Sequence, residues 1–212
     1  MRISGSFLMV SLLLLSSPVR ADEPLSPCFD FSKPNSQLLR SPTDQFPEEG
    51  NEFLAHGWRD EPSLRERVAW AEVRGTARQS IPALLKKLQD PMTHRDPGNT
   101  RVTATSVPFP GAWLRQKVEV KLKPVFFLTL EWIEEWMFVI TDGTVSDPKK
   151  VLVSFQKTSG TGHIRRFCGN FLLSKIGPEI TGVTIQEEII ADRRKPEDVE
   201  KGLLGTLRTL RK

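Results

Sequence analysis

Three glutamates around two tryptophans are the first residues in the chain that could do acid–base chemistry: Glu131, Glu134 and Glu135 lie next to Trp132 and Trp136. Two neighbouring carboxylates can serve as general acid and general base. Successive side chains of a strand point to opposite faces, so Glu131 and Glu135 fall opposite the tryptophans and Glu134 falls beside them. A carboxylate on an apolar face needs a proton or a cationic partner. The interpretation we favour is a bulge that turns Glu134 outward.

His163 is the second candidate, because Arg165 and Arg166 follow it closely. Such a group could orient the polar head of a ligand, with an arginine pairing to a phosphate or carboxylate at two points. The alternative is a histidine at the end of a hairpin with solvated arginines beside it. His56 and His94 have no partners at metal-ligand spacing. We therefore expect no metal site and no cofactor.

Two common enzyme motifs do not occur in the sequence. The segment Ser159-Gly160-Thr161-Gly162 lacks the lysine and the following helix of a phosphate-binding loop, and no G-x-S-x-G motif of a hydrolase elbow is present. The net charge is only +4, whereas nucleic-acid-binding proteins usually concentrate basic charge more strongly. We expect no nucleic-acid partner.

Segments with the pattern of strands make up most of the chain, and they must position these candidate residues. Residues 117–123 alternate apolar and charged side chains, which is typical of a half-buried antiparallel strand. Residues 127–140 place Leu130, Trp132, Trp136 and Phe138 on one face. Further extended stretches, separated by short turns, predict an antiparallel meander; they cover residues 67–74, 101–107, 151–155, 163–173 and 181–191.

Two helices are predicted around these strands. A short one follows Ser80, with Ile81, Leu84, Leu85 and Leu88 on one face. A longer one starts at Pro196 and carries an apolar stripe that includes Leu203. Gly202 lies beside this stripe, although glycine costs about 1 kcal/mol in a helix interior. A glycine at this position would let the sheet or a ligand approach the helix closely. The alternative, which we weigh equally, is that the glycine is an irregularity that the helix tolerates.

The first residues resemble a secretory signal peptide: Arg2 precedes the apolar run 7–15, and small residues lead to Ala21. We expect cleavage near Ala21 and an exported protein, periplasmic or extracellular.

In an oxidising compartment the two cysteines favour a disulfide between Cys28 and Cys168. The alternative is a buried Cys168 and a free Cys28 thiol. The predicted divisions are a signal peptide (1–21), an irregular N-terminal arm (22–64) in which 51–58 forms one helical turn, and a domain (65–212).

Three segments carry a resemblance to a known family. They are RVAWAEVRGTARQSIPALLKKL, LVSFQKTSGTGHIRRFCGNFLL and TGVTIQEEIIADRRKPEDVEKGLLGTLRTLR. In this order they resemble the START-like helix-grip (SRPBCC) superfamily, which includes lipid-transfer domains, the birch pollen allergen group and polyketide cyclases. The resemblance implies an α+β fold for residues 65–212, with six to seven curved antiparallel strands around a long C-terminal helix. It also implies a hydrophobic ligand between the sheet and that helix.

The expected function is binding rather than catalysis, with a hydrophobic small molecule or lipid as the partner and transient membrane contact. The expected ligand-binding residues are Leu130, Trp132, Glu134, Trp136, Phe138, His163, Gly202 and Leu203. Two alternatives stay open. One is an enzyme of cyclase or hydrolase type that uses Glu134 or His163. The other is an accessory protein with a collapsed cavity, whose N-terminal arm is the partner surface.

Overall fold

Eight strands form one antiparallel sheet in the order β1-β2-β8-β7-β6-β5-β4-β3. The structure is a computed structural model that describes residues 27–32, 39–40, 45–62, 66–93, 95, 100–107, 109, 112–125, 128–192 and 194–212. The strands are β1 (Phe53–Glu61), β2 (Glu66–Ala77), β3 (Thr100–Val107), β4 (Leu114–Val125), β5 (Leu128–Gly143), β6 (Pro148–Gly160), β7 (Ile164–Gly177) and β8 (Ile180–Ala191). The predicted signal peptide lies outside the described residues.

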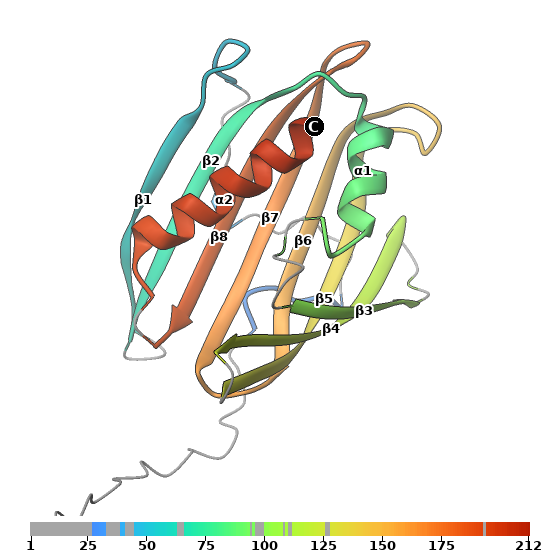
Figure 1. The fold of residues 1–212 in the computed structure, drawn as a ribbon. Coiled ribbons are helices and arrows are strands. Elements are labelled where there is room, and N and C mark those ends of the chain that lie inside the picture. Colours follow the sequence, from blue (N-terminus) through green and yellow to red (C-terminus); the bar gives the residue numbers. More distant parts are fainter. Residues whose placement is uncertain are drawn as a thin grey trace, which may run out of the picture.

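Both helices lie on the same face of the curved sheet (Figure 1). These are α1 (Ile81–Gln89) and α2 (Pro196–Arg211). The longer helix, α2, lies across β2 and β8 and buries Val199, Leu203, Leu207 and Leu210. Burial of such an apolar stripe is what holds an amphipathic helix on a sheet. The arrangement is an α+β helix grip, as the sequence predicts, with eight strands instead of six to seven. In the described part of the chain, neither helix combines the length and apolar character needed to cross a membrane.

Helix α2 approaches the sheet closely at Gly75 of β2. A Cβ atom added there would lie 2.9 Å from Cδ2 of Leu207 and 2.7 Å from Nη2 of Arg211. Glycine allows this contact because it has no side chain. The prediction that Gly202 permits close approach of the sheet is wrong, since the nearest atom to an added Cβ there is Nη2 of Arg194, at 3.7 Å.

Strand β1 is a second correction. The sequence interpretation placed residues 51–58 in a helical turn within an irregular arm, but Phe53–Glu61 pairs with β2 along its whole length. The segment contains no β-branched residue and has a glycine in its middle, so strand propensity alone does not identify it. Pairing with β2 supplies the stabilisation. Residues 22–64 are therefore not irregular throughout.

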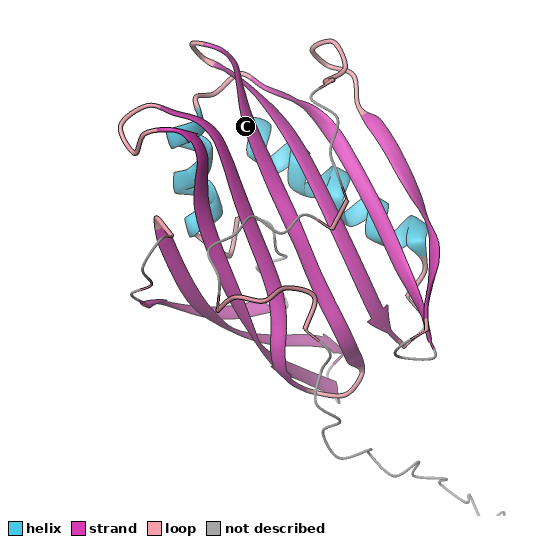
Figure 2. Cartoon of the chain, turned by 180° about the vertical axis from the view of Figure 1, so that it is seen from behind, coloured by secondary structure: helices cyan, strands magenta, loops and turns pink. Residues whose placement is uncertain are grey.

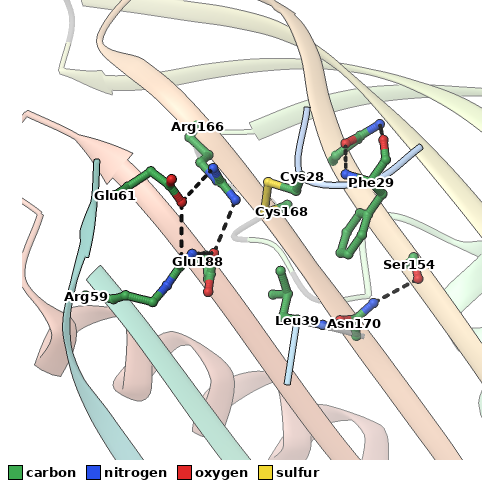
Figure 3. The surroundings of a disulfide bond; sticks show 11 residues. Cys28, Phe29, Leu39, Arg59, Glu61, Ser154, Arg166, Cys168, Asn170 and Glu188 are labelled. Carbon is green, nitrogen blue, oxygen red and sulfur yellow. Dashed lines mark hydrogen bonds and ion pairs between the residues drawn. A yellow bond between two sulfur atoms is a disulfide. The ribbon is translucent and has the colours of Figure 1, made fainter. Parts of the chain in front are cut away.

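Described segments of the N-terminal arm lie on the face of the sheet opposite the helices (Figure 2). The predicted disulfide joins Cys28 to Cys168 of β7. The amide side chain of Gln156 accepts a hydrogen bond from the Phe29 N–H (2.9 Å) and donates one to the Phe29 carbonyl (3.1 Å). Farther along, the Leu39 N–H donates to Oδ1 of Asn170, at 2.8 Å. The arm thus uses amide side chains of the sheet in place of a neighbouring strand (Figure 3).

A network of four charged residues lies next to the disulfide on this outer face (Figure 3). Glu188 is 2% exposed and lies 2.6 Å from Nη2 of Arg59 and 3.5 Å from Nη2 of Arg166. Glu61 contacts the same two arginines. Arg166, one of the two arginines considered for ligand binding, is therefore engaged on the face that does not carry the helices.

Candidate functional site

A cavity of about 900 Å³ lies between the inner face of the sheet, α2 and the residues that follow α1. Its wall is mainly aromatic and aliphatic and includes Trp132, Phe155, Phe167, Phe171, Ile189 and Leu203. Small-molecule sites typically measure about 300–1,000 Å³, with apolar walls and a few polar groups. The cavity has the size and the wall of a ligand site.

Seven of the eight predicted ligand-binding residues line this cavity: Leu130, Trp132, Glu134, Trp136, His163, Gly202 and Leu203. The eighth, Phe138, is fully buried in the core. Its ring stacks on Trp136 with 6.4 Å between centroids, and Trp113 packs edge-on against it. Phe138 therefore packs against Trp136, a residue of the cavity wall.

Glu134 points into the protein and is completely buried. The indole N–H groups of Trp132 and Trp136 donate to its two carboxylate oxygens, at 2.6 and 2.8 Å. Nη2 of Arg95 lies 2.8 and 2.7 Å from the same two oxygens. The favoured interpretation, a bulge that turns Glu134 outward, is wrong: the register does shift between Ile133 and Glu134, but the side chain stays inside.

The side chain of Glu134 stays buried because it has charged and polar partners inside the protein. A buried charge is tolerated when an opposite charge and further hydrogen bonds compensate its lost hydration. The side chain of Arg95 is only 10% exposed, and it comes from the segment after α1, far from β5 in sequence. In the sequence, the inward orientation of Glu134 was indicated by its position on the same strand face as Trp132 and Trp136. No periodic pattern pointed to Arg95.

Glu187 of β8 is a further cavity residue that sequence reasoning missed. Burial raises the pKa of its carboxyl from 4.5 to about 7, Arg194 and Arg95 oppose this shift, and Glu134 adds to it. Among the described residues, the structure gives Glu187 no hydrogen bond. It lies on the same strand face as Val183, Ile185 and Ile189. A carboxyl on the apolar face of residues 181–191 could therefore have identified Glu187 from the sequence.

Two guanidinium groups of the cavity keep unused donors. Arg95 and Arg194 both line it. Within the described part of the chain, Nη1 of Arg95 and Nε of Arg194 are buried without a hydrogen-bond partner. Nη2 of Arg194 donates to the carbonyl of Asp198, at 3.3 Å. Buried donors are nearly always paired in folded proteins, so these two guanidinium groups retain hydrogen-bonding capacity that no described residue uses.

His163 lies at the rim of the cavity, with a side chain that is 56% exposed. Its Nδ1 lies 3.0 Å from Oδ2 of Asp192, and Nη1 of Arg165 donates to Oδ1 of the same carboxylate, at 2.8 Å. The hydrogen bond with His163, and then that with Arg165, lower the pKa of Asp192. The rim is thus a set of paired charges, and the unused polar groups lie deeper.

The cavity combines apolar walls with hydrogen-bond donors and one carboxyl that titrates near neutral pH. Glu134, the catalytic alternative from the sequence, already accepts from two indoles and a guanidinium. Its capacity to accept a further hydrogen bond or a proton is therefore largely used. This chemistry suits recognition of a ligand with an apolar body and a polar head better than acid–base catalysis by Glu134.

Comparisons with known proteins concern the fold. No family model matches the chain, and no curated protein matches it. Solved structures with a similar fold include the human StarD13 (DLC2) lipid transfer and protein localization domain, with 11% identity over 73% of this chain and 85% of that one and a TM-score of 0.48. The Zhui aromatase/cyclase from Streptomyces sp. R1128 has 12% identity over 68% and 86%, with a TM-score of 0.42. Norcoclaurine synthase from Thalictrum flavum has 13% identity over 68% and 91%, also with a TM-score of 0.42. Likenesses at this level carry no argument about function.

Proposed function

We propose that the chain is an exported binding protein that holds a hydrophobic, lipid-like ligand in the cavity between the sheet and α2. The observation that carries the proposal is the apolar cavity of about 900 Å³. Removal of apolar ligand surface from water would provide most of the binding free energy, at about 25 cal/mol per Å². The ligand contacts would come from Leu130, Trp132, Glu134, Trp136, His163, Gly202 and Leu203, with Phe138 packed against Trp136.

Export is supported by two features of the chain. The first is the signal-peptide pattern that ends near Ala21. The second is the disulfide between Cys28 and Cys168, because such bonds persist mainly in oxidising compartments. Contact with a membrane would be brief and would serve to load or release the ligand.

Native mass spectrometry of the protein, expressed with its N-terminal residues and purified without detergent, tests the proposal. We expect an added mass in the range of a lipid and a mature N-terminus at Asp22. Empty protein in repeated preparations, with no shift of the melting temperature across a panel of lipids, would contradict the binding function. A cytoplasmic product that keeps residues 1–21 would contradict export alone.

A matched pair of glycine variants locates the site. Gly202 lines the cavity, whereas Gly205 of the same helix has no other atom within 4 Å of an added Cβ. We expect Gly202→Leu to reduce ligand binding at least about tenfold by filling the cavity, and Gly205→Leu to leave binding unchanged. Equal binding by the two variants would place the ligand elsewhere.

A further inference from the structure

We propose that the polar end of the cavity binds the head of a long-chain carboxylic acid, with Arg95, Arg194 and Glu187 as the residues that recognise it. The inference rests on the proposed function and adds the chemical class of the ligand. Its starting point is that these three residues line a cavity whose remaining wall is largely apolar.

Unused hydrogen-bonding capacity is the first argument. Among the described residues, Nη1 of Arg95 and Nε of Arg194 have no acceptor, and Glu187 has no hydrogen bond. A buried donor without a partner has a free-energy cost. A ligand oxygen that accepts from these groups would remove this cost, and a protonated Glu187 would add a third donor. The three residues line the same cavity, and a set of donors of this kind favours an acceptor-rich head such as a carboxylate.

The balance of charge is the second argument. Arg95 and Glu134 compensate each other as a close pair, and Asp192 at the rim is engaged by Arg165 and His163. Arg194 therefore adds one positive charge to the polar end, and Glu187 decides whether that charge is neutralised. With Glu187 protonated, the polar end carries one uncompensated positive charge, which a single negative charge on the ligand would neutralise. A carboxylate fits this balance better than a phosphate monoester, which carries up to two.

In the described part of the chain, the charged groups near Glu187 are confined to the residues that line the cavity. The neighbours paired with it are Ala71 of β2 and Gly169 of β7. The cavity residues of α2 in the described chain are Gly202, Leu203 and Thr206, none of which is charged. The state of Glu187 therefore depends on Arg194, Arg95 and Glu134, on the rim residues Asp192 and His163, and on the ligand itself.

This arrangement couples binding to a proton. Because the pKa of Glu187 is raised to about 7 by burial, part of the protein carries a negative charge at this position at neutral pH. A bound carboxylate repels that charge and favours the protonated form, so binding takes up a proton. The affinity for a carboxylic acid should then fall as the pH rises above about 7, by at most about tenfold per pH unit.

The test compares palmitic acid with 1-hexadecanol, which has the same chain length and a neutral head. Binding to delipidated mature protein would be measured by calorimetry between pH 6.5 and 8.5. We expect palmitic acid to bind at least about tenfold more tightly than hexadecanol at pH 6.5, as a charge-assisted hydrogen bond implies. We expect this preference to decrease by about tenfold or more by pH 8.5. Hexadecyl phosphate should bind more weakly than palmitic acid.

Two variants assign the effect to residues. Glu187→Gln keeps the size of the side chain and cannot ionise, so it should retain tight palmitate binding at pH 8.5 and remove the pH dependence. Arg194→Gln should lose about tenfold for palmitic acid and leave hexadecanol binding unchanged. Arg78→Gln is the matched control, because Arg78 pairs with Glu49 at the surface and does not line this cavity, and it should change neither affinity. Circular dichroism would verify that each variant is folded.

The outcomes separate the two proposals. Equal affinities for palmitic acid and hexadecanol, or a pH dependence that persists in Glu187→Gln, would overturn the carboxylate inference and leave the binding function intact. Absence of binding for all three amphiphiles would also overturn the carboxylate inference, and the native mass spectra with the lipid panel would then decide the proposed function. If Arg194→Gln does not fold, the comparison of the wild type with Glu187→Gln still decides the question.

Discussion

Cys168 of β7 holds Cys28 on the outer face of the sheet, although the two residues are 140 positions apart in the chain. The next residue, Phe29, exchanges two hydrogen bonds with the amide side chain of Gln156. The arm is thus attached by one covalent bond and by a pair of hydrogen bonds on the adjacent strand, β6. The cavity lies on the other face of the same sheet.

Removal of the disulfide should destabilise the fold and leave the cavity intact. The double variant Cys28→Ser, Cys168→Ala should lower the free energy of unfolding by about 3–5 kcal/mol, because the bond closes a long loop in the unfolded chain. Urea unfolding measures the effect. A reductant should shift the wild type toward the variant and leave the variant unchanged. A variant as stable as the oxidised wild type would contradict the prediction.

Neutralising Glu134 should be far more damaging than neutralising its neighbour. Glu134→Gln leaves the guanidinium of Arg95 buried without its counter-ion, which costs about 3–5 kcal/mol. Glu135 pairs with Arg115 at the surface, so Glu135→Gln should cost less than about 1 kcal/mol. Thermal and urea unfolding of the two variants provide the measurement. Similar losses in both would show that the Arg95–Glu134 pair does not stabilise the fold.

Two alanine substitutions at glycines should act in opposite directions. In Gly75→Ala the new methyl group meets Leu207 and Arg211 of α2, and overpacking of this kind costs about 1–3 kcal/mol. In Gly205→Ala nothing lies within 4 Å of the new group, so the gain in helix propensity should stabilise the protein by up to about 1 kcal/mol. The shift of the melting temperature gives the sign of each effect. A Gly75→Ala variant as stable as the wild type would contradict the close approach of α2 to β2.

His56 should contribute a pH-dependent stabilisation at the edge of the sheet. A hydrogen bond with Glu200 of α2, at 2.7 Å, raises the pKa of His56 above 6.5. The folded state therefore holds the proton more tightly than the unfolded state. The stabilisation is complete below pH 6.5 and is lost as the pH rises through the folded pKa.

The variant His56→Gln measures this contribution. The difference between its free energy of unfolding and that of the wild type should shrink between pH 6 and pH 8.5, and Glu200→Gln should show the same trend. Titration of Glu187 affects the wild type and the His56 variant alike and cancels in the difference. A difference that does not vary with pH would rule out the His56–Glu200 interaction as its source.

Regular alternation made most of the fold predictable. Residues 117–123 alternate strictly and lie within β4, and the apolar stripe that includes Leu203 faces the sheet from α2. The helix-grip arrangement follows from short turns between strands and a final amphipathic helix. Phe53–Glu61 escaped prediction because its propensity for a strand is weak and its partner, β2, supplies the stability.

The polar part of the cavity was predictable only in part. Parity placed Glu134 on the apolar face, and the same reasoning applied to β8 would have found Glu187. Arg95 could not be found in this way, because it belongs to no periodic segment and meets Glu134 only in the folded chain. Sequence periodicity reports which face a residue occupies, whereas a pairing between distant segments depends on the three-dimensional fold.

The pairing of β2 with β8 has a consequence for the order of folding. Strands β3 to β8 each pair with their neighbour in the chain, and β1 pairs with β2, so a meander and a hairpin can form from local contacts. Joining them requires Ala77 to meet Thr181 and Ala69 to meet Ile189, which closes a loop of roughly 100 residues. Such non-local pairing is slow. Since α2 packs on β2 and β8 together, the cavity is completed in this late step, and a ligand that binds only the completed cavity would stabilise its product.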